Sequence, residues 1–306
     1  MFNYTIKRIL QVIPMLMVLT IVVFFMVRLA PGDPVQNMLG LDVPPEMVEI
    51  ERENRGLNDP LHKQYIRFIK ELLRGDLGES IVTRKPIVDE LAERFPNTII
   101  LAFGGIVVGS LIGILFGIIA AVWHNKFWDN IIMVLSLLFL STPSFFLAML
   151  LMLYFTLKLG WLPSIGLDTP AHSVLPILTL GLQAVGFIAR TTRSSMLDVI
   201  NQDYIRTSRS RGIPNRVIIF VHALRNAIIP TITAIGLKFG VLLAGSAIVE
   251  TVFSINGVGR FIVDSVSKQD YPAIQGSVLV LAVTFVVVNT FVDIMYAFVD
   301  PRIKYE

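Results

Sequence analysis

Six long apolar blocks constrain the fold of this chain more than any other feature of its sequence. They cover residues 9–29, 98–123, 131–157, 174–189, 228–249 and 274–299. A helix needs about 20 apolar residues to cross a bilayer, and only the fourth block, which contains Pro176, is clearly shorter. Charged residues make up 16% of the chain, whereas a soluble domain carries roughly 25%. The blocks therefore predict an all-α integral membrane protein with six transmembrane helices.

The basic residues predict the orientation of these helices, because short loops rich in Lys and Arg stay on the cytoplasmic side. With the N-terminus inside, the short outer loops carry only Lys158, Arg260 and Lys268. The inner segments then carry Lys7, Arg8, Lys126, Arg190, Arg193, Arg206, Arg209, Arg211, Arg216, Arg225, Arg302 and Lys304. Both termini are therefore expected in the cytoplasm. The first block is expected to remain as a helix, since no small-residue cleavage site follows it.

The long outer segment, residues 31–96, is expected to be folded. Asn58-Asp59-Pro60 is a typical helix start, and apolar residues then recur at helical spacing as far as Gly75. A second short helix is expected from Pro86 to Arg94. These helices form either a cap that contacts an extracytoplasmic partner or roofs a cavity, or a folded loop without a partner.

Small residues at four-residue spacing mark two of the blocks. They are Gly105, Gly109, Gly113 and Gly117 in the second block, and Gly236, Gly240 and Ala244 in the fifth. Such stripes allow the backbones of membrane helices to approach closely. Each stripe is therefore either a static helix contact or an interface that moves during transport.

The sequence lacks the residues of common enzymes. There is no cysteine, no G-x-x-x-x-G-K-[ST] phosphate loop and no H-E-x-x-H metal motif, and the four histidines are scattered. We therefore predict a non-catalytic chain that holds neither a cofactor nor a metal.

Four ionisable residues lie within or at the ends of the apolar blocks, where charge is costly and often functional. Lys238 lies about two turns into the fifth block and is the best candidate to meet a substrate carboxylate. Its alternative partner is Asp293 or a neighbouring subunit. Glu250 and Asp293 are weaker candidates for the substrate pathway, because they and Arg28 lie near block ends.

A polar island from Asn201 to Arg225 separates the fourth and fifth blocks. It holds five arginines and a single acid, Asp203. Asp203 is expected to cap a helix over residues 204–211 that ends at Gly212 in the left-handed conformation. Asn215 is expected to cap a second helix that runs to Arg225. This arrangement predicts a docking elbow on the cytoplasmic side, with a solvated basic loop as the alternative.

The polar island and several short motifs along the chain, in their sequence order, together resemble one family, the bacterial ABC-importer permeases of the peptide/nickel branch. The resemblance covers the whole chain, although Ser208, Ser210, Asn256 and Lys238 depart from the usual residues. The cytoplasmic coupling motif is matched by Asp203, Tyr204, Arg206, Thr207, Arg209, Arg211, Gly212, His222, Arg225, Asn226 and Pro230. Further matches are residues 28–34, 250–253, 257–260, 270–272, 293–296 and 300–302.

The resemblance implies a membrane subunit that works with several partners. These are a second homologous permease, two cytoplasmic P-loop ATPases that bind ATP and Mg, and an extracytoplasmic substrate-binding protein. The chain would then lie in the bacterial inner or plasma membrane, without nucleic acid as a partner. It divides into residues 1–30 (first helix), 31–96 (outer segment), 97–299 (permease core, with the coupling loop at 190–227) and 300–306 (C-terminus).

Cargo identity stays open at this point. Dipeptides or oligopeptides come first, and glutathione second because residues 83–86 and 160–163 also resemble glutathione-importer permeases. A nickel or other metal chelate comes third. An autonomous ion-coupled carrier and a membrane scaffold are alternatives of other classes, but a proton-coupled carrier would need linked intramembrane acids.

Overall fold

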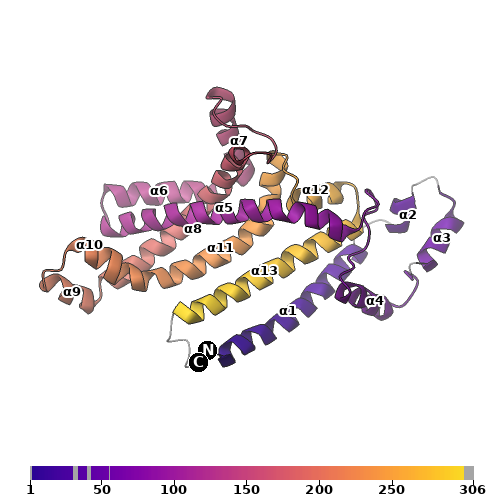
Figure 1. The fold of residues 1–306 in the computed structure, drawn as a ribbon, viewed down its shortest axis with the longest axis horizontal. Coiled ribbons are helices and arrows are strands. Elements are labelled where there is room, and N and C mark those ends of the chain that lie inside the picture. The colour runs from indigo at the N-terminus through magenta and orange to yellow at the C-terminus, as the bar shows by residue number, and fades with distance from the viewer. Residues whose placement is uncertain (1, 30–33, 40–42, 55, 300–306) are drawn as a thin grey trace.

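The computed structural model describes residues 2–29, 34–39, 43–54 and 56–299. Part of the predicted outer junction (30–33) and the predicted C-terminal segment (300–306) lie outside the described residues. Across the described ranges the regular structure is helical throughout. Five helices are long and apolar enough to span a membrane: α1 (Phe2–Leu29), α5 (Ile87–Val122), α8 (Pro170–Ile200), α11 (Leu224–Val252) and α13 (Tyr271–Val299). Figure 1 shows them running roughly along the long axis of the molecule.

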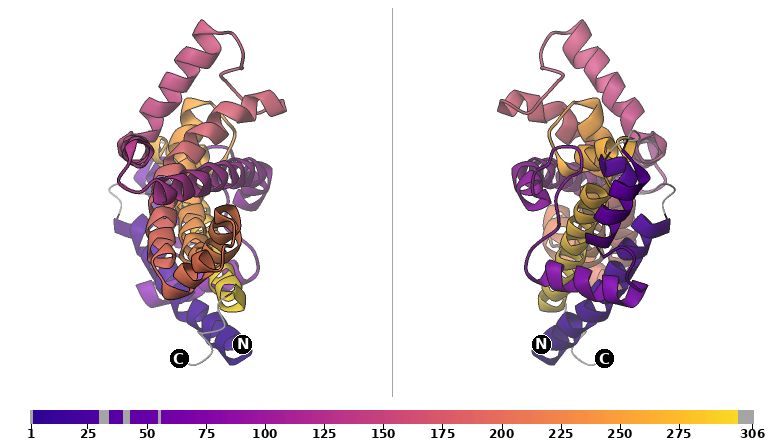
Figure 2. Two further views of the ribbon diagram at one scale, coloured as in Figure 1. Left: turned by 90° about the vertical axis from the view of Figure 1, so that its left-hand side faces the viewer. Right: turned by 90° about the vertical axis from the view of Figure 1, so that its right-hand side faces the viewer.

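A sixth span requires a bent pair of helices. The block 131–157, predicted as one span, is divided into α6 (Phe127–Ser141) and α7 (Ser144–Leu151) with its π-helical extension η1 (Met152–Lys158), and the two parts meet at 107°. The break lies at Thr142, which is extended (ψ 124°). A residue before proline is driven out of the helical region by the proline ring, so Pro143 explains the break. Figures 1 and 2 show α7 leaving the bundle.

Helix α8 lies at the centre of the bundle. Its Pro176 does not interrupt it, because neighbouring helices in a membrane bundle can compensate the lost hydrogen bond. The glycine stripe of α5 faces α8. A Cβ placed on Gly105, Gly109, Gly113 or Gly117 would lie 2.5–2.9 Å from side-chain carbons of α8, so only glycine permits this approach of the two backbones.

The second stripe lies against the last helix. A Cβ on Gly236 would approach Val292 to 2.2 Å, and one on Gly240 would approach Phe285 to 2.5 Å, both in α13. Helix α1 packs on the outside of α13. Its outward face is apolar and exposed, including Ile13 and Val18, as expected for helices that meet lipid or another membrane subunit.

The segment predicted to lie outside forms a helical cap at one end of the bundle. It consists of α2 (Pro34–Leu39), α3 (Pro45–Asn54) and α4 (Leu61–Leu73). Helix α4 packs on α1 because Tyr65 and Phe68 contact Phe24, with ring centroids 5.2 and 5.8 Å apart. The predicted separate helix 86–94 is wrong. Those residues are the first turns of α5, which continues through Pro96 into the membrane segment.

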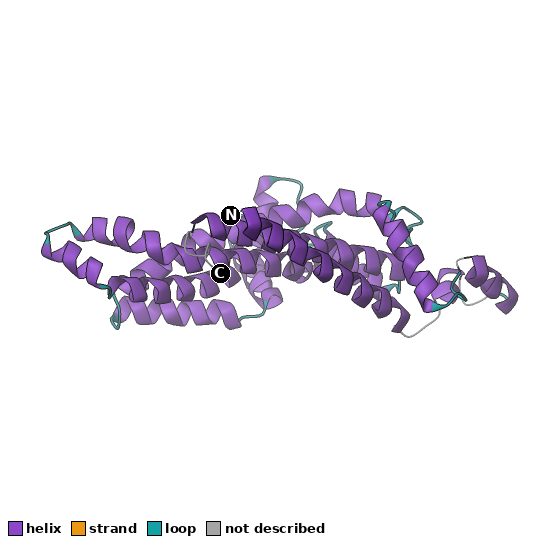
Figure 3. Cartoon of the chain, turned by 90° about the horizontal axis from the view of Figure 1, so that it is seen from below, coloured by secondary structure: helices purple, strands orange, loops and turns teal. Residues whose placement is uncertain are grey.

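The helices of the polar island lie at the end opposite to α2–α4 (Figure 1), and Figure 3 shows the same separation from below. Helix α12 (Val258–Ser267), between α11 and α13, lies towards the end that carries α2–α4.

Candidate functional site

The polar island folds into α9 (Asp203–Ser210), α10 (Asn215–Val217) and the π-helical segment η2 (Ile218–Ala223), which leads into α11. We call residues 203–226 the basic elbow. The predicted caps are wrong: Gln202 and Pro214 precede the two helices, and neither cap makes a side-chain hydrogen bond. Asp203 is instead the first residue of α9, where its negative charge interacts favourably with the helix dipole.

Gly212 makes the bend of the basic elbow possible. Its φ is +75°, as predicted from its place after α9. The amide of Gly212 donates to the carbonyl of Arg209 (3.0 Å), and that of Ile213 donates to Ser208 (3.3 Å). These two bonds form a Schellman motif, which satisfies the last carbonyls of a helix and needs a left-handed residue between them.

The second arm of the basic elbow is continuous with the membrane helix. The prediction that this helix ends near Arg225 is wrong, because the chain stays helical from Asn215 through α10, η2 and α11, with Pro230 inside α11. The π-helical segment η2 widens this helix locally without interrupting it. The elbow is thus joined to α11 without an intervening loop.

Tyr204 and Ile205 hold α9 against this continuous helix. Ile205 is fully buried in an apolar cluster that includes Ile118 of α5, Met196 of α8 and Ile218 of η2. The Tyr204 hydroxyl accepts a hydrogen bond from Asn226 Nδ2 (2.8 Å). Through these contacts α9 touches α5, α8 and the helix formed by η2 and α11, and its hydrogen bond is to α11 itself.

The outer surface of the basic elbow is cationic, with an apolar strip. Arg206, Arg209, Arg211, Arg216 and Arg225 are all exposed. Phe220 and Val221 are also more than half exposed. Thr207 and His222, also predicted for this site, differ in exposure. Thr207 is exposed and its hydroxyl donates to the Asp203 carbonyl (3.0 Å), whereas His222 is half-buried.

Sequence reasoning missed Ile205, Phe220 and Val221. Their only signal was an apolar residue within a polar segment, which does not distinguish an anchor from an exposed contact residue.

An ion pair beside the basic elbow was also missed. Arg193 of α8 donates two hydrogen bonds to Asp129 of α6, one from Nε to Oδ1 (2.6 Å) and one from Nη2 to Oδ2 (2.7 Å). The backbone amide of Asn125 also donates to Asp129 (2.9 Å). These contacts fix the turn between α5 and α6 to α8. No sequence spacing could indicate a pair 64 residues apart.

Glu250 lies in the interior of the bundle. Its carboxylate is fully buried and accepts hydrogen bonds from Thr98 Oγ1 (2.8 Å), Ser246 Oγ (2.9 Å) and the Arg260 amide (2.9 Å). It therefore joins α5, α11 and the start of α12. Both oxygens of Glu250 are thus already bonded inside the bundle, and its predicted place in the substrate pathway stays a prediction.

Lys238 and Asp293 do not meet. Asp293 of α13 instead pairs with Arg8 of α1 at 3.1 Å. Lys238 lies half-buried on α11, and within the described residues its ammonium group makes no hydrogen bond or ion pair. The predicted pathway residues Lys238, Glu250 and Asp293 are thus not brought together. Within the same described ranges, no three His, Asp or Glu side chains could hold a metal ion.

Family models match nearly the whole chain. Residues 113–305 match the model described as "Binding-protein-dependent transport system inner membrane component", and residues 1–102 match the N-terminal model of the same kind of protein. Among similar proteins is the glutathione transport system permease protein GsiC of Salmonella paratyphi A, 44% identical over 306 residues, which are 100% of both chains. The protein of the same name from Escherichia coli K12 is 42% identical over the same length.

Solved structures of the same fold belong to other ABC transporters. An inward-facing structure of the MetNI methionine ABC transporter matches with a TM-score of 0.56 and 22% identity, covering 69% of this chain and 96% of that chain. An amino acid ABC transporter with histidines matches with a TM-score of 0.52 and 17% identity, covering 70% and 94%. At these identities the likeness concerns the fold alone.

Proposed function

The chain belongs to the family of binding-protein-dependent transport system inner membrane components, and on this premise we propose that it is the permease subunit of an ABC importer for glutathione. The observation that supports glutathione as the cargo is the 44% identity, over the full length of both chains, to a protein named as a glutathione transport permease. The earlier preference for dipeptides and oligopeptides thus gives way to glutathione, which is itself a short peptide.

ATP is proposed to act through partner subunits that dock on the basic elbow. Five exposed arginines around an apolar strip suit the surface of a cytoplasmic protein, since Arg and aromatic residues are enriched at interfaces. Movement of the docked ATPases displaces α9. Ile205 and Tyr204 transmit the displacement to the α10–η2–α11 helix, which alters the packing of the bundle.

The orientation follows from the same proposal. The basic elbow and both termini face the cytoplasm, and the helical cap α2–α4 faces the extracytoplasmic binding protein. A second, homologous permease completes the pathway, against the exposed apolar faces of this chain. ATP and Mg are held by the ATPases, and this subunit catalyses no reaction.

Lys238 is proposed to face the cargo. Its ammonium group is half-buried and unpaired within the described residues, so a carboxylate is the partner that its charge favours. Glutathione carries two carboxylates. Asp293 is proposed to hold α1 on α13 through Arg8 rather than to contact cargo.

The test is transport by the assembled complex in proteoliposomes. The chain is reconstituted with its partner permease, its ATPases and its binding protein, and uptake of labelled glutathione, of a dipeptide and of a nickel chelate is measured with and without ATP. ATP-dependent uptake of glutathione is the expected result. Uptake of only the dipeptide or the chelate would refute the cargo, and uptake by this chain alone under an ion gradient would refute the importer.

A further inference from the structure

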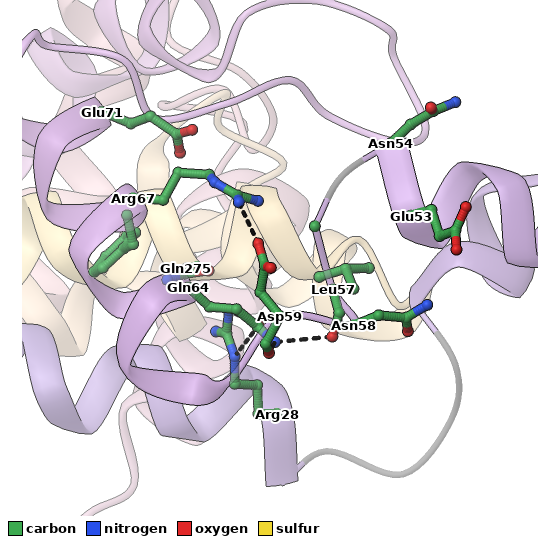
Figure 4. Close-up of a pocket in the computed structure, with 12 residues that line it drawn as sticks. Arg28, Glu53, Asn54, Leu57, Asn58, Asp59, Gln64, Arg67, Glu71 and Gln275 are labelled. Atoms are coloured by element: carbon green, nitrogen blue, oxygen red, sulfur yellow. Dashed lines mark hydrogen bonds and ion pairs between the residues drawn. The ribbon is translucent and has the colours of Figure 1, made fainter.

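A polar cavity of about 780 Å³ lies at the outer end of the chain, on the opposite side of the bundle from the basic elbow. It is open to solvent on one side and is lined by the end of α1, the turn between α3 and α4, the first turns of α4 and the start of α13. Figure 4 shows the charged and amide side chains around it. Its size lies in the range of small-molecule sites, and none of the roles proposed above uses it.

The cavity contains a cation held only by neutral groups. Arg28 donates through Nε and Nη2 to Gln64 Oε1 (3.1 and 2.8 Å) and through Nη1 to the Phe24 carbonyl (3.1 Å). Its guanidinium also stacks on the Phe24 ring, 3.3 Å from the centroid. Within the described residues no carboxylate pairs with Arg28.

The same cavity holds a donor without an acceptor. Gln275 Nε2, from α13, is buried and has no hydrogen-bond partner among the described residues. Buried polar groups without partners are rare in folded proteins and call for an explanation. The orphaned amide of Gln275 and the uncompensated charge of Arg28 both favour an anion in the cavity.

The rim of the cavity carries negative charge. Asp59 is bound by Arg67 at 2.5 Å, whereas Glu53 and Glu71 are exposed and have no ion pair within the described residues. Among the described residues, the site therefore has a cation without a carboxylate partner inside and two carboxylates without ion pairs at its rim, which suits a ligand that carries an anion and an ammonium close together.

We propose that this cavity binds the α-amino-acid end of a short peptide, with the carboxylate on Arg28 and Gln275 and the ammonium near Glu53 or Glu71. Glutathione has such an end at its γ-glutamyl residue, where the carboxylate and the ammonium share one carbon. The assignment rests on the proposed cargo and deepens it: the permease itself contacts the peptide outside the membrane. The headgroup of phosphatidylethanolamine has the same pairing of charges and is the competing source of this chemistry.

The test is equilibrium binding of reduced glutathione to the assembled transporter, without binding protein and without ATP, in nanodiscs of phosphatidylglycerol. Arg28→Gln and Gln275→Ala are each expected to weaken binding roughly tenfold, the effect of losing one or two hydrogen bonds to a charged group. Gln275→Ala removes an unpartnered donor and so does not depend on how well the Arg28 variant folds. Arg74→Gln, an exposed arginine at the end of α4 that does not line the cavity, is the matched control.

Two outcomes overturn the proposal. One is glutathione binding that is unchanged in both cavity variants. The other is loss of glutathione binding when phosphatidylethanolamine replaces phosphatidylglycerol, which would assign the cavity to lipid. Uptake assays distinguish failure of the cavity assignment from failure of the proposed function. If the wild-type transporter imports glutathione but the cavity variants bind it normally, only the cavity assignment fails. If wild type does not import glutathione, the cargo itself is wrong.

Discussion

Replacement of Ile205 by alanine should disconnect α9 from the membrane helices. Ile205 is the one residue of α9 that the structure buries, and its exposed fraction is 0%. An isolated helix of eight residues is not stable in water, so α9 depends on this contact for its position. The change removes three carbon atoms, which corresponds to about 2.4 kcal/mol of lost burial. The cavity left behind brings the expected cost to about 2–5 kcal/mol.

A loss of about 3 kcal/mol would lower the ratio of docked to undocked α9 by roughly a hundredfold. ATP-driven uptake in proteoliposomes should then fall at least tenfold, while the ATPases still hydrolyse ATP. Ile66→Ala provides the matched control, because Ile66 is on the outer helix α4 and more than half exposed. Size-exclusion chromatography verifies that each variant assembles. An Ile205→Ala complex that assembles and transports at the wild-type rate would refute the mechanical account of the basic elbow.

Three further predictions concern the elbow and the bundle. Gly212→Val should abolish coupled uptake, because valine disfavours φ +75°, whereas Gly212→Asn should retain it; equal uptake by both variants would contradict the role of the bend. Gly109→Leu should lower the melting temperature of the detergent-solubilised complex by overpacking worth about 1–3 kcal/mol, whereas Leu111→Ile on the exposed face of α5 should not. Asp129→Asn should destabilise the complex by roughly 3–5 kcal/mol, since it leaves Arg193 without its counter-ion; the removal of both charges together should cost less, and an equal cost would show that the pair is unimportant.

The sequence predicted the class of fold and the place of the basic elbow for identifiable reasons. Apolar blocks of membrane length and glycine stripes are local signals, and the structure contains the corresponding helices and close contacts. The left-handed Gly212 was also predictable, because a helix end followed by Gly and then Pro has few other conformations. Residue roles in the docking of ATPases and in the cargo pathway remain predictions.

Errors arose where neighbouring elements decide the outcome. Pro143 breaks a helix, whereas Pro96, Pro176 and Pro230 lie inside continuous helices. The sequence alone did not show which proline would break its helix, because packing around each proline determines whether the lost hydrogen bond is tolerated. Similarly, the sequence places Glu250 near a block end, whereas only the structure shows the three hydrogen-bond donors around its carboxylate.

By itself, then, the sequence determined that the chain must cross a membrane, that the basic elbow bends at Gly212, and which surface is cationic. These properties depend on composition, on periodicity and on the conformations open to single residues. The tertiary structure alone decided which charges are paired: Asp129 with Arg193, Asp293 with Arg8, Glu250 with neutral donors, and Arg28 with no carboxylate among the described residues. Pairing of this kind depends on distances between helices that are far apart in the chain, and a buried charge takes its role from whichever group the fold places beside it.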